Sequence, residues 1–220
     1  MGDFKAIIFD MDGVLVDSEP LFLKAINSLV IQENAAPISE DENRDHLIGT
    51  TIDETWRRLK QLRGLPLSIP EYIERYEVVV EQVLKQELAA QPGVVALIKE
   101  CQRRGLPKAV ASSSLKAWVN LKLESIGLQD AFDVVLGGDD VTLGKPEPDI
   151  YLLAAERLGL PPQECIAIED SPVGIAAAVS AGIHTIAVRT ESTKGLDISR
   201  AHSVLDSLID FDLSLMAEHP

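Results

Sequence analysis

Positive charge is scarce in this sequence: 20 of the 220 residues are lysine or arginine, against 35 aspartates and glutamates. The resulting formal net charge of −15 implies an acidic surface, which repels nucleic acids and anionic membranes. We therefore expect neither of these as a partner. The same surface would also repel small anionic substrates, unless a bound cation and a few positive side chains reverse the field inside one cleft.

Cysteine is almost as scarce, because the sequence contains only Cys101 and Cys165, far apart from each other. They form no C-x-x-C or zinc-type spacing, so we expect two buried, reduced thiols. Long apolar runs are missing, and the first residues do not show the pattern of a signal peptide. The expected location is therefore the cytoplasm.

Several familiar functional motifs are missing too. Gly144-Lys145 does not belong to a P-loop, because Asp139 stands where its leading glycine should be and Pro146 where its metal-binding Ser or Thr should be. The sequence contains no G-x-S-x-G nucleophile elbow and no G-x-G-x-x-G dinucleotide fingerprint. The four histidines have no ligand spacing, and we interpret them as surface or structural residues.

What the sequence does contain is an alternation of strand and helix patterns. Residues 5–9 form a short apolar run that ends in an acidic turn, and beyond residue 93 the two patterns alternate. This alternation predicts an α/β fold, a Rossmann-like parallel sheet with helices on both faces. The predicted helices of this part are 94–104, 115–126, 149–158 and 172–181, and the predicted strands are 108–111, 134–136, 165–168 and 185–188.

The segment between about residues 18 and 88 shows helical patterns alone, so it interrupts the α/β fold after the first strand. Hydrophobic residues make up 46% of the chain, enough to bury a sizeable core. We therefore expect an α/β core domain of residues 1–17 and 89–220 and an inserted α-helical domain of residues 18–88.

Polar residues end the predicted strands, at the edge of a parallel sheet where ligands bind. Asp10, Ser112 and Asp170 occupy these ends, and Lys145 lies in a following loop. Each has an ordinary structural explanation alone, but two carboxylates brought together would repel unless a hard cation lay between them. Magnesium fits because it prefers oxygen ligands, here from Asp10, Asp170 and a turn carbonyl. Ser112 and Lys145 could then bind a phosphate group.

Four segments occur in the order of a known set of motifs. They read F-D-M-D-G-V-L-V-D-S at 9–18, V-A-S-S-S at 110–114, G-K-P-E-P-D at 144–149 and I-E-D-S-P-V-G at 168–174. Together they resemble the haloacid dehalogenase (HAD) superfamily, over residues 9 to about 188. The resemblance implies the HAD fold with an α-helical cap inserted at 18–88, within the beta-phosphoglucomutase-like group, which includes mutases and sugar or polyol phosphatases.

The same resemblance implies roles for individual residues. Asp10 would be the nucleophile that forms an aspartyl-phosphate, and Asp12 the general acid and base. Dehalogenases of the superfamily lack an acid at the position of Asp12, so its presence favours phosphoryl transfer. The resemblance also implies two binding sites. Mg²⁺ would be held by Asp10, the Asp12 carbonyl and Asp170, with Glu169 beside the metal. Phosphate would be bound by Ser112, the Ser113 backbone amide and Lys145.

Two alternatives stay open beside a magnesium-dependent phosphatase of small phosphorylated metabolites. Mutases of the group carry a cap His and a cap Arg that grip the distal phosphate, where this sequence has apolar Phe22 and Ile52. A mutase remains the second hypothesis, because Arg75 could replace them from another position. The third is a catalytically silent domain that binds a metabolite. We expect a monomer or small homo-oligomer, and the sequence does not name the substrate.

Overall fold

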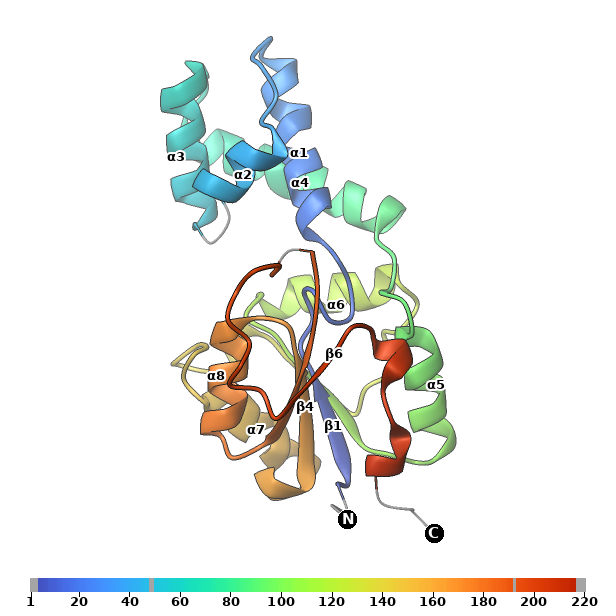
Figure 1. Cartoon of the computed structure of the whole chain (residues 1–220). Coiled ribbons are helices and arrows are strands. Elements are labelled where there is room, and N and C mark those ends of the chain that lie inside the picture. Colours follow the sequence, from blue (N-terminus) through green and yellow to red (C-terminus); the bar gives the residue numbers. More distant parts are fainter. Residues whose placement is uncertain (1–3, 48–49, 192, 217–220) are drawn as a thin grey trace. The chain divides into compact units, whose positions relative to one another are not determined.

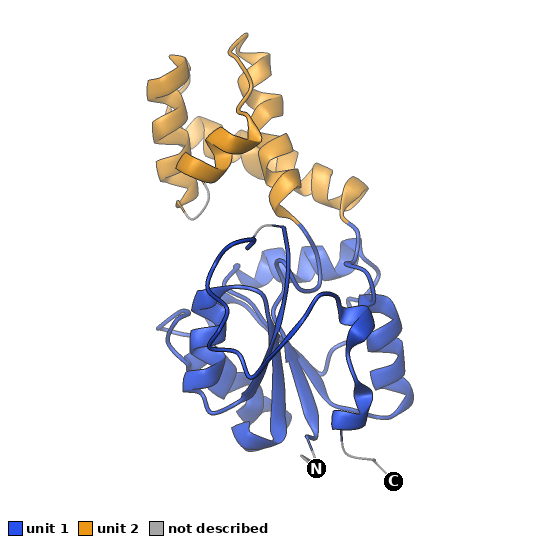
Figure 2. Ribbon diagram, viewed as in Figure 1, with its two compact units in different colours: residues 1–17, 89–220 blue, residues 18–88 orange. Residues whose placement is uncertain are grey.

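The computed structural model describes residues 4–47, 50–191 and 193–216 (Figure 1). The chain divides into two compact units, which are coloured separately in Figure 2. Unit 1 comprises residues 1–17 and 89–220, and unit 2 comprises residues 18–88. Each unit is described by itself below.

Unit 1 is built on a six-stranded sheet in which every neighbouring pair of strands is parallel. The strand order is β3-β2-β1-β4-β5-β6, so β1 lies between β2 and β4. The predicted α/β fold with a parallel sheet is therefore confirmed. The strands are β1 (Ala6–Phe9), β2 (Lys108–Ala111), β3 (Val134–Leu136), β4 (Cys165–Glu169), β5 (His184–Val188) and β6 (Ser203–Leu205).

Helices cover both faces of this sheet: α5 (Val94–Arg103), α6 (Lys116–Ser125), α7 (Asp149–Leu158) and α8 (Pro172–Ser180). Figure 1 shows α7 and α8 on one face and α5 on the other. Because side chains alternate along a strand, Ala6 and Ile8 of β1 pack under α7 and α8 in one buried cluster. All four residues of β1 are fully buried, which explains their continuous apolar sequence.

Unit 2 consists of α1 (Glu19–Gln32), α2 (Glu40–His46), α3 (Ile52–Arg63) and α4 (Ile69–Glu87). It has a hydrophobic core of its own, in which Trp56 of α3 stacks on Tyr72 of α4 with ring centroids 4.9 Å apart. Ser68 caps α4, because its backbone N–H donates to the Glu71 carboxylate at 2.9 Å. Unit 2 therefore has buried hydrophobic residues that are distinct from those of the sheet.

The structure adds elements that the sequence patterns did not indicate, chiefly β6 and α2. β6 is a three-residue strand with Ser203 and Val204 exposed, and α2 has one buried residue, Asn43, so neither shows an amphipathic period. The predicted free thiols are confirmed, since Cys101 and Cys165 are both buried and unpaired. Among the described residues, no helix is long and apolar enough to cross a membrane.

Candidate active site

The carboxyl ends of the three central strands bring the predicted site residues to one edge of the sheet. Asp10 directly follows β1, Ser112 directly follows β2, and Asp170 follows Glu169, the last residue of β4. The backbone N–H of Asp10 still donates to Ile168 of β4 at 2.9 Å, which fixes the point where the chain leaves the sheet.

Three carboxylates converge at this edge. Asp10, Glu169 and Asp170 are all buried, and each offers an oxygen within 4.8 Å of the oxygens of the other two. Burial, together with the neighbouring carboxylates, raises the pKa of Asp10 well above its usual value. Burial and the adjacent Glu169 raise the pKa of Asp170 to about 7. Charged carboxylates at these positions therefore need a positive partner.

Lys145 supplies part of that positive charge. Its ammonium donates to Asp10 Oδ1 and Glu169 Oε1, both at 2.5 Å, and to the carbonyl of Ala111 at 3.0 Å. The Lys145 side chain is 4% exposed; burial alone would lower its pKa, but the Asp10 and Glu169 carboxylates raise it above the usual value. Lys145 is therefore a permanent cation that orients the Asp10 carboxylate from one side.

Glu169 accepts hydrogen bonds on both of its carboxylate oxygens. Its Oε1 accepts from the Tyr151 hydroxyl at 2.7 Å as well as from Lys145. Its Oε2 accepts from the backbone N–H of Asp170 and from both the N–H and the hydroxyl of Ser171, at 3.1 to 3.3 Å. Gly174 of α8 leaves room for this carboxylate, because a Cβ there would lie 1.8 Å from Oε1.

The arrangement fits a hard divalent cation. Lys145 contributes one positive charge against three buried carboxylates, so the cluster formed by these described residues has an excess of negative charge when all three are ionised. Gly13 makes room beside it: with φ +91° its backbone turns through the left-handed region, and a Cβ there would lie 2.0 Å from Asp170 Oδ2. Because Lys145 and Tyr151 already occupy Oε1 of Glu169, the oxygens of Asp10 and Asp170 are better suited as ligands.

Asp12 has different surroundings from Asp10, although the two are separated by one residue. Its carboxylate accepts from Lys122 at 2.6 and 2.7 Å, one contact on each oxygen, and from the Ser114 hydroxyl at 3.1 Å. The Asp12 side chain is 36% exposed, whereas that of Asp10 is 11% exposed. The structure thus places Asp10 inside the acidic cluster and Asp12 in a separate hydrogen-bond network that is more exposed to solvent.

The predicted phosphate-binding residues share a second feature, a pocket of about 330 Å³. Ser112, Ser113 and Lys145 all line it, so residues from two distant motifs meet at one cavity. The Ser112 hydroxyl is almost fully buried and accepts from the backbone N–H of Ser114 at 3.1 Å, which fixes its orientation.

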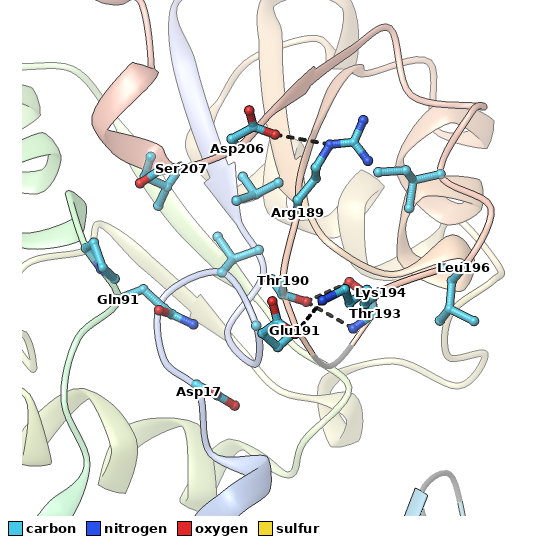
Figure 3. A pocket seen from close by; sticks show the side chains of 17 residues that line it. Asp17, Gln91, Arg189, Thr190, Glu191, Thr193, Lys194, Leu196, Asp206 and Ser207 are labelled. Carbon is cyan, nitrogen blue, oxygen red and sulfur yellow. Dashed lines mark hydrogen bonds and ion pairs between the residues drawn. The ribbon is translucent and has the colours of Figure 1, made fainter. Parts of the chain in front are cut away.

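A larger pocket of about 520 Å³ lies beside the cluster of Asp10, Glu169 and Asp170 (Figure 3). Thr190 joins the two, because it lines this pocket while its hydroxyl bonds to Asp170 Oδ2 at 3.0 Å and to Thr193 at 2.6 Å. Figure 3 shows ion pairs within the lining, Arg189 with Asp206 and Lys194 with Glu191. The lining thus carries both signs of charge beside apolar side chains such as Val14, Leu196 and Ile198.

The sequence reasoning missed several residues of these networks, among them Ser114, Lys122, Tyr151 and Thr190. Lys122 left a signal, since it stands in an apolar helical stripe with Val119. Tyr151 left none, because a tyrosine in an amphipathic helix is an ordinary core residue.

Phe22, Ile52 and Arg75, on which the expected distinction between a mutase and a phosphatase depends, lie in unit 2. Phe22 is on α1, and Ile52 opens α3 and packs against the core of that unit. Arg75 is on α4, where its guanidinium contacts Glu33 at 3.4 Å. Within unit 2, then, Ile52 has a packing role and Arg75 has an acidic neighbour.

Comparison with known proteins gives a consistent family. A sequence model described as "Haloacid dehalogenase-like hydrolase" matches residues 7–188. "Phosphorylated carbohydrates phosphatase" of Thermotoga maritima is 35% identical over 83% of this chain and 83% of its own length. "Hexitol phosphatase A" of Escherichia coli is 33% identical, over 84% of this chain and 82% of its own.

A solved structure agrees with these sequence matches. CbbY from Rhodobacter sphaeroides, crystallised in complex with phosphate, matches with a TM-score of 0.82 and 30% identity, covering 97% of this chain and 99% of that one. The family model alone spans most of the chain and includes every strand-end residue discussed above. The chain therefore belongs to the haloacid dehalogenase-like hydrolases and is an enzyme of that family.

Proposed function

We propose that this enzyme is a magnesium-dependent phosphatase that hydrolyses small phosphate monoesters through an aspartyl-phosphate on Asp10. The observation that carries the proposal is the buried cluster of Asp10, Glu169 and Asp170, oriented by Lys145 and lying next to Asp12. A hydrolase that only activates water would not need a carboxylate such as that of Asp10 to be held between a lysine and a cation site. In-line phosphoryl transfer needs both positioning and charge neutralisation.

The residues that would hold the cation are Asp10 and Asp170, together with the backbone carbonyl of Asp12. A bound Mg²⁺ would neutralise charge on the phosphate oxygens and on the two carboxylates. Glu169 would act from beside the metal, because its oxygens already accept from Lys145, Tyr151 and neighbouring backbone groups. Ser112, the Ser113 amide and Lys145 would bind the remaining phosphate oxygens from the 330 Å³ pocket.

In the first half of the reaction, a carboxylate oxygen of Asp10 attacks phosphorus and the bond from phosphorus to the ester oxygen breaks. Asp12 gives its proton to that departing oxygen, which leaves as a neutral alcohol. In the second half, water attacks phosphorus, Asp12 takes the proton of the water, and the bond between Asp10 and phosphorus breaks. Inorganic phosphate is released, and both aspartates return to their starting states.

The substrate class we propose is sugar or polyol phosphates. Its support is the similarity to proteins named for phosphorylated carbohydrates and hexitols. Apolar Phe22 and Ile52 support a phosphatase over a mutase, because neither side chain can grip a second phosphate. We further propose that unit 2 acts as the cap, with residues that set specificity.

The test is a panel of sugar, polyol and nucleotide phosphates assayed for phosphate release at fixed Mg²⁺, alongside p-nitrophenyl phosphate. We expect turnover that stops when a chelator is in excess and returns when Mg²⁺ is restored. Asp10→Asn should lose turnover, while Asp133→Asn, at the opposite edge of the sheet, should keep it. Activity that survives chelation, or an active Asp10→Asn protein checked for deamidation, would show that the mechanism is wrong.

A further inference from the structure

A lysine lies in the core-facing stripe of α6, where an apolar side chain would be expected. Lys122 is flanked on that face by Val119 and Leu123, and its side chain is 1% exposed. Lysine is almost never fully buried without a partner, because removing its charge from water costs several kcal/mol. Its position therefore requires an explanation beyond packing.

The partner is Asp12, which we have proposed as the acid and base of the reaction. The Lys122 ammonium reaches both carboxylate oxygens, at 2.6 and 2.7 Å, and also lies 3.3 Å from the Ser114 hydroxyl. The Ser114 hydroxyl in turn donates to Asp12 Oδ2 at 3.1 Å, so the three side chains contact one another. Contacts to both oxygens fix the rotation of the carboxylate as well as its place.

We infer that Lys122 is a positioning residue that aims the Asp12 carboxylate at the reacting oxygen atoms. This inference rests on the proposed function, because it assigns Lys122 a task only if Asp12 moves protons. The carboxylate is 36% exposed, so without a fixed partner it could rotate toward solvent. The Lys122 side chain is 1% exposed, so this contact comes from a buried group, whereas 36% of the Asp12 side chain is accessible to solvent.

The structure also separates this network from the nucleophile. Lys145 contacts Asp10 and Glu169, whereas Lys122 contacts Asp12 and Ser114. Losing Lys122 should therefore disturb proton transfer while phosphate binding and attack by Asp10 continue. A purely structural ion pair that ties α6 to the loop after β1 would instead slow all substrates alike.

The test compares Lys122→Met, Lys122→Arg and Ser114→Ala with wild type on p-nitrophenyl, phenyl and benzyl phosphate, whose leaving groups are increasingly basic. Because misplacing a catalytic group by 1 Å costs on the order of 100-fold, we expect kcat for benzyl phosphate to fall about 100-fold in Lys122→Met. The fall in kcat/KM, which reports the phosphorylation step and not hydrolysis of the phosphoenzyme, should be smaller for p-nitrophenyl phosphate, since its leaving group needs little protonation. KM should change little, and Lys122→Arg should recover part of the loss.

Lys108→Met is the matched control, because Lys108 is a buried lysine on β2 that pairs with Asp133 at 3.5 Å, near the opposite edge of the sheet from the site. It should destabilise the protein without changing the dependence on the leaving group. Ser114→Ala removes one contact to Asp12 without burying an unpaired charge, so it tests the same point if Lys122→Met does not fold.

A double-mutant cycle with Asp12→Asn decides between the two roles. If Lys122 acts through Asp12, adding Lys122→Met to Asp12→Asn should slow benzyl phosphate by less than about 3-fold. If Lys122→Met slows the Asp12→Asn enzyme as much as it slows wild type, or if it slows all three esters equally, the inference is overturned while the proposed function stands. An Asp12→Asn enzyme that hydrolyses benzyl phosphate normally would reject the proposed role of Asp12 itself, and the inference with it.

Discussion

Gly174→Ala is a small change with two opposing consequences for α8. Alanine is the better helix former, so by propensity alone the substitution should stabilise the helix by up to about 1 kcal/mol. The added Cβ, however, would lie 1.8 Å from Glu169 Oε1, and real contacts of this kind are essentially never shorter than 3.0 Å. Backbone strain is not involved, because Gly174 is an ordinary helical residue.

The clash should dominate, because the Glu169 carboxylate has nowhere to go without losing partners. It is fully buried, and Oε1 accepts from both Lys145 and Tyr151. A hydrogen bond to a charged group contributes about 1.5–3 kcal/mol, so losing even one outweighs the propensity gain. We expect a net destabilisation of about 2 kcal/mol, and a fall in kcat on the order of 100-fold because Lys145 shifts with its partner.

Urea unfolding and phosphatase assays on p-nitrophenyl phosphate measure the two effects. Ser180→Ala is the matched control: Ser180 is exposed on the same helix, so it gains helix propensity without meeting Glu169. It should be neutral or stabilised by up to about 0.5 kcal/mol, with unchanged kcat. A Gly174→Ala protein that is as stable and as active as Ser180→Ala would refute the reasoning.

Three further outcomes are expected. Mg²⁺ at about 100 times its dissociation constant should stabilise the protein by about 2.7 kcal/mol, a rise in Tm of about 5–10 °C by scanning fluorimetry; an equal rise in Asp170→Asn would contradict the assigned ligands. Tyr151→Phe should lose about 1.5–3 kcal/mol by urea unfolding, because its hydroxyl bonds to the buried Glu169 carboxylate. A loss of less than about 0.5 kcal/mol would count against the role of Glu169. Asp12→Asn should release a burst of about one equivalent of p-nitrophenol and gain one phosphoryl group by mass spectrometry, whereas benzyl phosphate should give no burst; equal slowing of both esters without a burst would contradict the acid and base role.

The sheet could be predicted from the sequence because its central strands are short apolar runs bounded by turns. Lys108–Ala111 and Val134–Leu136 have the same bounds in the structure as in the prediction. Since the carboxyl ends of parallel strands share one edge, the meeting of Asp10 with Asp170 followed from strand order alone. The roles of these residues in turnover stay predictions.

The remaining parts of the site depend on contacts that leave no local pattern. Tyr151 meets Glu169 because α7 packs across the sheet next to β1 and β2, and its sequence neighbours are those of any amphipathic helix. Lys122 interrupts the apolar stripe of α6, which is visible in the sequence. An isolated lysine in such a stripe, however, does not indicate which carboxylate it contacts. Side-chain direction, which decides both contacts, is set by tertiary packing.

Asp10 and Asp12 show how one turn can supply two carboxylates with different chemistry. Asp10 lies inside the buried cluster, whereas Asp12, two residues further on, contacts Lys122 and Ser114 instead. Asp10, which contacts Lys145 and is 11% exposed, is held in place and shielded from water, as suits the nucleophile that we propose. Asp12, on Lys122 and with more than a third of its side chain exposed, has the access to leaving group and water that proton transfer requires. Because different lysines orient the two carboxylates, either environment can be altered by substitution while the other is retained.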